Sequence, residues 1–487
     1  MQFNYNFKVI FKVIGILLLI NGGFMLTCLP FSFYYNEGDH LALISSSLIT
    51  IGIGSLLLLL TRNLHTNEMR KKDGYLIVTM GWLSMSFFGS LPYIISGAIP
   101  DLTNAFFETL SGFSTTGATV LTDIESVDKG ILFWRSLTQW IGGMGIIVLT
   151  VAILPLLGIG GMQLFVAEAP GISPDKLQPR IKETAKRLWI IYCGLTVTAL
   201  ALLWAGGMTF YDAINHSLTT MATGGFSTKN ASIAHYQDPF IQYVIIFFMF
   251  MAGTNFTMTY FGLHGKFRKV LRNEEFRFYL IFCVASSLIV GLIIFNLGHD
   301  TFEKSIRDAL FQIVSVVTTT GYVTHDYTSW TSFLTVVFFL LMFAGGSAGS
   351  TAGGVKLVRH ILLIKNSLLE LKRILHPSAI IPVRFNGKSV SRDITFNVLA
   401  FIMIYILIVC FGTIAVSSFG IDFNTSLGAV ATTLGNIGPG IGDVGPVDNF
   451  AHLPTGVKWI LSFMMLLGRL ELFTVLILFT PFFWRKV

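Results

Sequence analysis

The chain has 487 residues and a formal net charge of +7, with 53% hydrophobic and only 12% charged residues. A soluble domain carries about 25% charged residues, so this composition excludes an ordinary soluble protein and favours a membrane protein. Nucleic-acid binding is disfavoured too, because the basic residues lie in short segments between apolar runs.

Ten apolar runs are long enough to be interpreted as membrane-spanning helices. Crossing about 30 Å of hydrocarbon takes about 20 apolar residues in an α-helix. The first run exceeds the apolar core of a signal peptide and no A-x-A-like site follows it, so we expect a retained helix. In chain order the runs lie at 9–30, 41–61, 75–96, 131–157, 188–206, 240–262, 277–297, 330–346, 394–419 and 457–483.

The distribution of charge predicts the orientation. If the N-terminus is cytoplasmic and the runs alternate, most of the 33 Lys and Arg residues fall on the cytoplasmic side. The positive-inside rule then places both termini in the cytoplasm. Acidic residues gather on the outer side, where they would concentrate cations. The basic inner face is explained by topology alone, or it is a docking surface for a cytoplasmic partner.

A fourfold internal repeat divides the chain. Each copy has a short polar-capped stretch, a Thr-rich stretch and a glycine, and each lies between two apolar runs. The copies lie at 104–119, 212–228, 308–324 and 425–440, and aligning their glycines matches Gly117, Gly224, Gly321 and Gly435. We expect two N-terminal helices in 1–72 and repeat units in 73–172, 173–272, 273–376 and 377–487.

The short stretches are predicted to be half-helices, because about ten residues cannot cross a membrane. Their expected N-caps are Asn104, Asp212, Asp308 and Thr425 or Ser426. Each half-helix would aim the negative end of its dipole inward, and four such ends around one axis favour a cation.

The glycine loops predict a pore. A dehydrated cation needs oxygen ligands, which rings of backbone carbonyls provide, and glycine supplies the positive φ that such backbone requires. Non-helical backbone at membrane depth is tolerated where it lines a cavity. The alternative is four glycines for helix packing, but those would lie inside the apolar runs. No copy reads TVGYG, so we expect fewer carbonyl layers and looser selectivity. The predicted ligands are Thr115, Thr116, Gly117, Ala222, Thr223, Gly224, Thr319, Thr320, Gly321, Thr433, Leu434, Gly435 and Asn436.

A second glycine cluster interrupts the eighth apolar run. It is too rich in glycine to remain a regular helix, and Val355 stands where a P-loop would need Lys. We interpret it as an intramembrane gate below the predicted filter, with a simple helix kink as the alternative. The predicted gate residues are Gly345, Gly346, Gly349, Gly353 and Gly354.

Arg469 is a basic residue deep within an apolar run. Such a charge costs roughly 2.5–3.5 kcal/mol on insertion scales and usually faces a cavity or a partner. Glu471 lies on another helical face and is a poor direct partner. We therefore assign Arg469 to the gate, as an electrostatic barrier below the filter; the alternative is a structural salt bridge with another carboxylate.

The motifs TTGAT, ATGGFST, TTTGY, TLGNIGPG, GGSAGSTAGGVK and GRLELFT resemble the Trk/Ktr/HKT superfamily of potassium transporters over essentially the whole chain. The length and the two extra N-terminal runs are similar to its TrkH-type membrane subunits. The resemblance implies an all-α membrane protein in which four M1–pore helix–M2 units, K⁺-channel-like, surround a pseudo-fourfold pore after two extra helices.

The resemblance also implies a function and partners. K⁺ would be the bound and transported ion, taken up across a bacterial inner membrane, with no organic cofactor in this chain. A homodimer would carry one pore per protomer. Cytoplasmic nucleotide-binding regulatory subunits (TrkA-like) would dock on the basic inner face.

Two other function classes are weighed against a pore. Alternating-access transporters also use broken helices, but their repeats are inverted, whereas these units contain two full spans each and share one orientation. A membrane enzyme is disfavoured, because the chain has no HExxH or GxSxG motif. His216 lies on a predicted pore helix, where we expect a structural hydrogen-bonding role.

Overall fold

The computed structural model describes residues 7–62, 71–145, 181–298, 301–379 and 381–485. Helices account for most of these residues. Their strands are β1 (Arg384–Phe385) and β2 (Lys388–Ser389), which form one antiparallel hairpin. The predicted all-α membrane class is confirmed.

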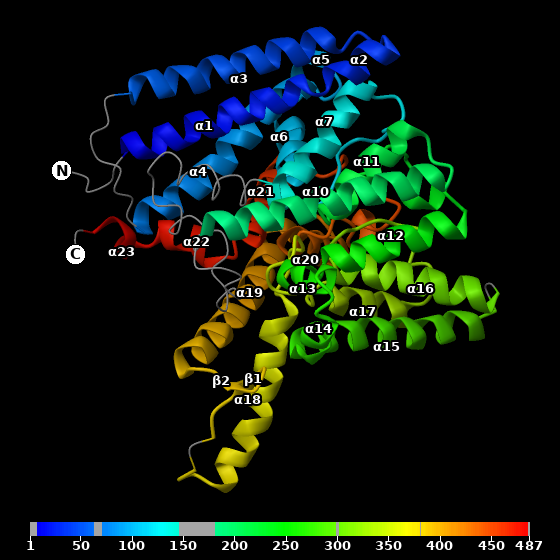
Figure 1. The fold of residues 1–487 in the computed structure, drawn as a ribbon, viewed down its shortest axis with the longest axis vertical. Coiled ribbons are helices and arrows are strands. Elements are labelled where there is room, and N and C mark those ends of the chain that lie inside the picture. Colours follow the sequence, from blue (N-terminus) through cyan, green and yellow to red (C-terminus); the bar gives the residue numbers. More distant parts are fainter. Residues whose placement is uncertain (1–6, 63–70, 146–180, 299–300, 380, 486–487) are drawn as a thin grey trace.

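Two long helices and a short one precede the repeat: α1 (Phe7–Leu26), α2 (Leu29–Tyr35) and α3 (His40–Leu60). Figure 1 shows α1, α3 and the following helix α4 packed side by side. Glycines allow α1 and α3 to approach closely, because a Cβ at Gly15 or Gly54 would lie within 3.0 Å of the other's carbonyl oxygen.

Each of the four units has the predicted order of a long helix, a half-helix, a loop and a second helix. Unit 1 comprises α4 (Lys71–Gly89), α5 (Leu91–Ser96), α6 (Leu102–Phe113), α7 (Lys129–Trp140) and the π-helical turn η1 (Ile141–Gly145). Unit 2 comprises α10 (Ile181–Ala205), α11 (Phe210–Met221), η3 (Ser232–His235), α12 (Pro239–Ala252), α13 (Phe256–Leu263) and α14 (Phe267–Arg272).

Units 3 and 4 repeat this plan. Unit 3 comprises α15 (Glu274–Asn296), α16 (Phe302–Val317), α17 (Ser332–Leu341) and α18 (Leu357–Leu375). Unit 4 comprises α19 (Arg392–Ser417), α20 (Phe423–Gly435), η4 (Gly442–Val444), α21 (Thr455–Arg469), α22 (Phe473–Leu476), η5 (Ile477–Phe479) and α23 (Pro481–Trp484).

The second helices of units 2, 3 and 4 are interrupted, so not all of the ten apolar runs are single straight helices. Within the described residues, 6 helices are long and apolar enough to cross a membrane. Two further spans are helix pairs bent by 111° between α12 and α13 and by 112° between α21 and α22. The run at 330–346 contains only the ten-residue α17, and part of the run at 131–157 lies outside the described residues. Gly253 lies at the first bend, whereas the second bend contains no glycine and places Glu471 and Leu472 at positive φ.

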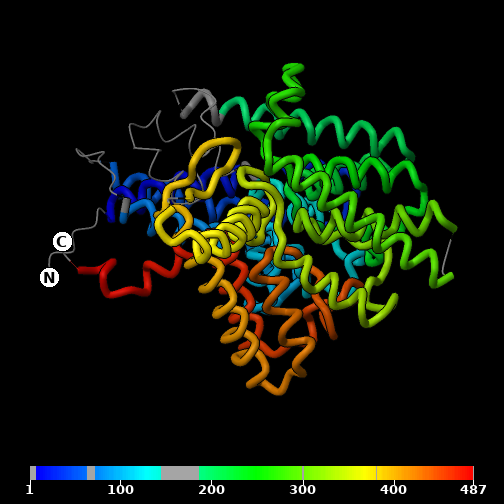
Figure 2. Tube along the Cα trace, turned by 90° about the horizontal axis from the view of Figure 1, so that it is seen from below, coloured from blue at the N-terminus to red at the C-terminus, as the bar shows by residue number. Residues whose placement is uncertain are grey.

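The half-helices α6, α11, α16 and α20 lie in the interior, each against second helices of the repeat. Contacts join α7 to α6 and α11, α12 to α11 and α16, and α21 to α20 and α6. Figure 2 shows the green segments of units 2 and 3 on one side, the orange helices of unit 4 on another, and the blue N-terminal helices beyond. The repeat therefore closes on itself around an axis.

The half-helices begin one turn or more earlier than predicted. Their N-caps are Asp101, Thr209, Thr301 and Asp422, and each side chain accepts a hydrogen bond from the backbone N–H three residues on. Asn104, Asp212 and Thr425 instead supply those N–H donors, while Asp308 lies further along α16. A polar residue three positions into a helix resembles a cap in the sequence, which explains the error.

Candidate functional site

Four loops that follow the half-helices meet at the centre of the molecule. We call them ring loops 1 to 4, formed by residues 115–120, 223–228, 319–324 and 436–441. A Cβ added at a glycine of each loop would lie within 3.0 Å of a backbone carbonyl oxygen of the next loop. The pairs are Gly117 with Gly224, Gly225 with Thr320, Gly321 with Ile437, and Gly438 with Thr116. These contacts run 1 to 2 to 3 to 4 and back to 1, so the loops form a closed ring.

All four loops leave their half-helices with the same backbone geometry. The first residue has positive φ, at 54° for Thr115, 54° for Thr223, 57° for Thr319 and 53° for Asn436. In each case its N–H donates to the carbonyl three residues back, and the next N–H donates to the carbonyl five residues back from itself. This is the Schellman pattern of helix termination, which uses up two of the free carbonyls at the helix end. The half-helix therefore fixes the direction in which each loop departs.

This geometry corrects the alignment of the repeats. The glycines with positive φ are Gly117, Gly225, Gly321 and Gly438, so Gly224 and Gly435 are not the equivalents of Gly117 and Gly321. Aligning the first glycine of each motif misplaced copy 2 by one residue, because two glycines adjoin there. It misplaced copy 4 by three residues, because α20 runs on to Gly435 and Asn436 takes the left-handed position.

The predicted ligands therefore occupy two kinds of backbone. All predicted ligands of copies 1 and 3 lie in the ring loops, as do Thr223 and Gly224 of copy 2 and Asn436 of copy 4. Ala222 is the C-cap of α11, and Thr433, Leu434 and Gly435 lie in α20. Ile437, Gly225 and Gly438 complete the ring and were missed. A comparison of all glycines after each Thr-rich stretch would have offered Gly225 and Gly438 as candidates, without deciding between the registers.

Each corner between neighbouring units is also tied by a side chain, and the four ties comprise an ion pair, two phenols and an amide. At the corner of units 2 and 3, the hydroxyl of Tyr322 in loop 3 donates to the His216 carbonyl of the half-helix α11 at 3.2 Å. At the corner of units 3 and 4, the hydroxyl of Tyr327, three residues after loop 3, donates to the Gly440 carbonyl of loop 4 at 2.7 Å. Between loops 4 and 1, the Asn436 amide donates to the Thr116 hydroxyl at 2.9 Å.

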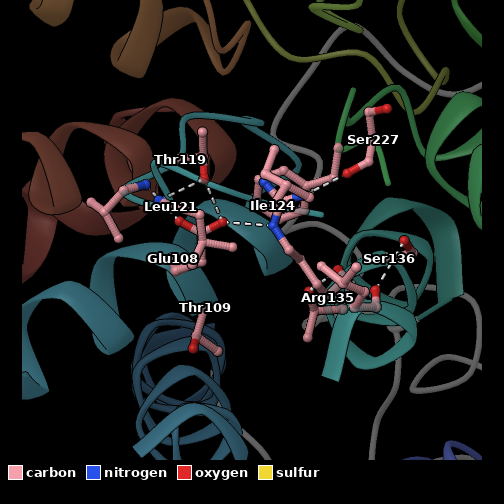
Figure 3. Close-up of polar contacts among 12 residues, drawn as sticks. Glu108, Thr109, Thr119, Leu121, Ile124, Arg135, Ser136 and Ser227 are labelled. Carbon is pink, nitrogen blue, oxygen red and sulfur yellow. Dashed lines mark hydrogen bonds and ion pairs between the residues drawn. The ribbon is translucent and has the colours of Figure 1, made fainter. Parts of the chain in front are cut away.

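The tie between loops 1 and 2 is a buried ion pair. Arg135 Nε lies 2.7 Å from Glu108 Oε1, and the side chains are 2% and 0% exposed. Glu108 also accepts hydrogen bonds from the Thr119 hydroxyl and the Val120 N–H in loop 1, while Arg135 donates to the Ser227 carbonyl in loop 2 at 3.0 Å. Figure 3 shows Glu108 and Arg135 joined between these two loops. The Glu108–Arg135 pair is therefore shielded from solvent while it joins the two loops.

Gln139, one turn after Arg135 on α7, reinforces the same corner. Its amide nitrogen donates to the Gly224 carbonyl at 2.6 Å, and its amide oxygen accepts from the Phe226 N–H at 3.0 Å. One helix thus positions loop 2 through two polar side chains. Polar residues spaced four apart on a half-apolar helix were the available sequence signal.

The second glycine cluster forms a non-helical segment, residues 342–356, which packs where the half-helices α11, α16 and α20 end and the ring begins. We call it the 342–356 loop. The Gly353 N–H donates to the Thr319 hydroxyl at 2.7 Å, and a Cβ on Gly353 would press against the Gly435 carbonyl. The Thr351 hydroxyl lies 3.1 Å from the carbonyls of Met221 and Ala252. The loop therefore contacts units 2 and 4 as well as its own, and the predicted interruption of the helix is present.

Two groups from unit 2 and the start of unit 3 hold the outer turn of this loop. The Asn255 amide donates to the Ala348 carbonyl at 2.6 Å, and Glu275 accepts from the Ala348 N–H at 2.7 Å. Gly345, Gly349 and Gly354 have positive φ, which explains why the segment needs glycine there, while Gly346 makes close backbone contacts.

Arg469 joins the 342–356 loop to the ring. Its guanidinium donates to the Thr115 hydroxyl at 3.1 Å, to the Thr351 carbonyl at 2.9 Å and to the Gly143 carbonyl at 2.7 Å, and it also bonds the Gly142 carbonyl. These oxygens belong to ring loop 1, the 342–356 loop and the π-helical turn η1 that follows α7. Glu471 forms an ion pair with Arg359 of α18.

His216 is fully buried on α11, as expected for a structural residue. Its Nδ1 lies 2.8 Å from the Asp212 carbonyl and its Nε2 lies 2.9 Å from the Ser227 hydroxyl. Both ring nitrogens are therefore engaged with the half-helix and with ring loop 2. Among the described residues, no group of three or more His, Cys, Asp or Glu side chains could hold a metal ion.

Known proteins resemble the chain over its whole length. The profile of the TrkH family, described as a cation transport protein, matches residues 40–486. The Trk system potassium uptake proteins TrkH of Salmonella typhimurium and of Escherichia coli K12 are each 40% identical over 486 residues, covering 99% of this chain and 100% of theirs. The crystal structure of the potassium transporter TrkH from Vibrio parahaemolyticus matches with a TM-score of 0.88 at 37% identity, covering 100% of both chains. The chain belongs to the TrkH family of cation transport proteins.

Proposed function

We propose that this chain carries K⁺ into a bacterial cell through a pore whose filter is the ring of four loops. The observation that carries the proposal is the closed set of backbone contacts from each loop to the next. Such a ring places main-chain carbonyls from four parts of one chain around one axis, which is how a cation can exchange its water shell for protein oxygens. The potassium uptake proteins named above, which are 40% identical to this chain over 486 residues, support K⁺ as the transported ion.

The ligands in this proposal are backbone carbonyls of the corrected register. They come from Thr115–Gly117, Thr223–Gly225, Thr319–Gly321 and Asn436–Gly438. The C-terminal ends of α6, α11, α16 and α20 point toward the ring, so their negative dipole ends favour a cation there. A second set of carbonyl ligands is proposed at the half-helix ends that precede the ring loops. It comprises the carbonyls of Ala222, Thr433, Leu434 and Gly435.

The 342–356 loop and Arg469 form the proposed gate. The loop lies directly against the inner side of the ring, and Arg469 holds it to ring loop 1. A guanidinium at that position repels a cation leaving the filter, because the repulsion between two positive charges is strongest where little water screens it. Opening requires the loop to release Thr319, Met221 and Ala252 together.

Three further proposals concern the setting of the protein. The positive-inside rule supports an inner-membrane protein with both termini in the cytoplasm. The basic inner face supports docking of a cytoplasmic nucleotide-binding subunit of the TrkA kind, and we propose a homodimer with one pore in each copy. The unit boundaries at residues 72, 172, 272 and 376 stay predictions.

The test is ⁸⁶Rb⁺ uptake by purified protein in liposomes, with K⁺ or Na⁺ as competitor and with or without an imposed pH gradient. We expect uptake that K⁺ suppresses at lower concentration than Na⁺ does. A folded protein that takes up no ⁸⁶Rb⁺, or whose uptake K⁺ fails to suppress, overturns the proposal. Dependence on the pH gradient would assign proton coupling, and independence would assign a channel-like mechanism.

The register of the ring has its own test. Gly438 has φ of 104° and contacts loop 1, whereas Gly52 on α3 has open space where a Cβ would lie. We expect Gly438→Ala to abolish uptake and Gly52→Ala to leave it unchanged. Normal uptake by Gly438→Ala contradicts the corrected register.

A further inference from the structure

A polar side chain braces ring loops 1, 2 and 3 from behind at one shared position. Counting seven residues back from the left-handed residue that starts each loop gives Glu108, His216, Gln312 and Ala429. Glu108 binds Thr119 and Val120, His216 binds Ser227, and Gln312 donates to the Thr324 hydroxyl and the His325 carbonyl. In unit 4 the position is alanine. The first three half-helices thus hold their own loops, and the fourth has no polar side chain at this place.

At unit 1 this brace extends to the neighbouring loop. Arg135 pairs with Glu108, donates to the Ser227 carbonyl and lies with its guanidinium carbon 3.5 Å from the centre of the Phe226 ring. Of the four inter-loop ties, this is the one that contains an ion pair; the other three use a phenol or an amide. The planar guanidinium therefore fixes loops 1 and 2 to one another in three ways at once.

A rigid corner has a consequence for ion choice. Na⁺ is smaller than K⁺, so carbonyls that replace its water shell must move inward by a fraction of an ångström. Loops 1 and 2 cannot approach one another without distorting the Glu108–Arg135 pair, and the Glu108 side chain is 0% exposed, so solvent does not compensate for a weakened pair. The ion pair therefore opposes the contraction that Na⁺ requires.

We propose that Glu108 and Arg135 are positioning residues that set the preference of this pore for K⁺ over Na⁺. The proposal rests on the potassium-uptake function proposed above and names two side chains that touch no ion. Their effect is on selectivity: without the pair, loops 1 and 2 relax and accept Na⁺, while the pathway itself remains open.

The chain offers a matched control. Arg307 of α16 is also a buried arginine paired with a glutamate, with Nε 3.0 Å from Glu303, and it donates to Gln242 of α12 at 3.0 Å. Its partner Glu303 is 54% exposed, and none of these contacts is with a ring loop. Arg307→Lys thus makes the same chemical change as Arg135→Lys at a buried arginine that does not brace the ring.

The experiment compares Arg135→Lys, Glu108→Gln and Arg307→Lys with the unaltered protein in ⁸⁶Rb⁺ uptake, recording the concentrations of Na⁺ and of K⁺ that halve it. We expect the Na⁺-to-K⁺ ratio of these concentrations to fall about tenfold in Arg135→Lys and Glu108→Gln, and by less than twofold in Arg307→Lys. Unchanged ratios in the first two variants, or an equal fall in Arg307→Lys, overturn the proposal.

A binding measurement covers variants that transport too slowly. Thermal unfolding of the detergent-solubilised protein is followed with K⁺ or Na⁺ added, because an ion that binds the folded state raises its melting temperature. The unaltered protein should be stabilised more by K⁺, and Arg135→Lys should be stabilised equally by both ions. If the unaltered protein shows neither uptake nor ion-specific stabilisation, the potassium function fails; if it shows both and the variants match it, only the role of the pair fails.

Discussion

The ring loops and the 342–356 loop are both glycine-rich, non-helical segments at membrane depth, yet they are held in different ways. The ring loops touch one another through their main chains, and rigid half-helices set their direction. The 342–356 loop is held mainly by hydrogen bonds: it donates to Thr319, Glu275 and, through its own Thr351, to Met221, and it accepts from Asn255 and Arg469. The first arrangement resists any change of shape, whereas the second can be released by breaking a few bonds. This contrast is what the proposed filter and the proposed gate require.

The largest effect is expected where main chain meets main chain. Gly321 has φ of 79°, and a Cβ there would lie within 3.0 Å of the Ile437 carbonyl. In Gly321→Ala, the left-handed backbone conformation costs about 1–2 kcal/mol for a residue with a Cβ. The added Cβ also clashes with a main-chain carbonyl, which cannot move aside as a flexible side chain could. We expect uptake of ⁸⁶Rb⁺ to fall at least a hundredfold, with Gly52→Ala as the control. Uptake within threefold of normal would show that the ring is not close-packed.

The next largest effect is expected for Arg469, which joins ring loop 1 to the 342–356 loop. Arg469→Ala removes a positive charge and the bonds to Thr115 and Thr351, so we expect ⁸⁶Rb⁺ uptake to rise several-fold. Arg62→Ala, at an exposed position after α3, is the control and should leave uptake unchanged. Unchanged uptake in Arg469→Ala rules out the barrier and leaves the arginine a purely structural role.

A smaller effect is expected for one hydroxyl of the 342–356 loop. Thr351→Val keeps the shape of the side chain but removes a donor to the Met221 and Ala252 carbonyls, a loss of about 1 kcal/mol. We expect a two- to fivefold rise in uptake with nearly normal thermal stability. Thr198→Val on α10, which loses a bond to its own helix, is the matched change. Equal behaviour of both variants would show that the loop is not held through Thr351.

The smallest effect is expected at a neutral tie of the ring. Tyr327→Phe removes the donor to the Gly440 carbonyl, which contributes about 1 kcal/mol. Backbone packing between loops 3 and 4 remains, so uptake should stay within twofold and the melting temperature should fall by a few degrees at most. A collapse of uptake would place more weight on this hydroxyl than on main-chain packing.

Much of the fold could be predicted from hydropathy and the internal repeat. The two N-terminal helices, the four units and the non-helical segment after α17 follow from apolar length and glycine content. The register of ring loops 2 and 4 could not, because it depends on where α11 and α20 end. That point is decided by the left-handed residue, Thr223 or Asn436, and a one-residue shift leaves the local sequence pattern unchanged.

The side-chain ties were less predictable still. Glu108 and Arg135 lie 27 positions apart, and neither has a local pattern that reveals the other. Such pairs are found only when the packing of α6 against α7 is known, since burial of a charge is acceptable only with a partner in reach.

The four corners of the ring come from one polypeptide and carry an ion pair, two phenols and an amide. In a tetramer of identical chains, a point mutation alters every corner simultaneously and its influence cannot be apportioned. In this chain a substitution changes one corner of the ring at a time, and the other three corners of the proposed filter remain unchanged as an internal reference. The asymmetry thus makes this architecture a natural instrument for measuring what each face of a cation's surroundings contributes.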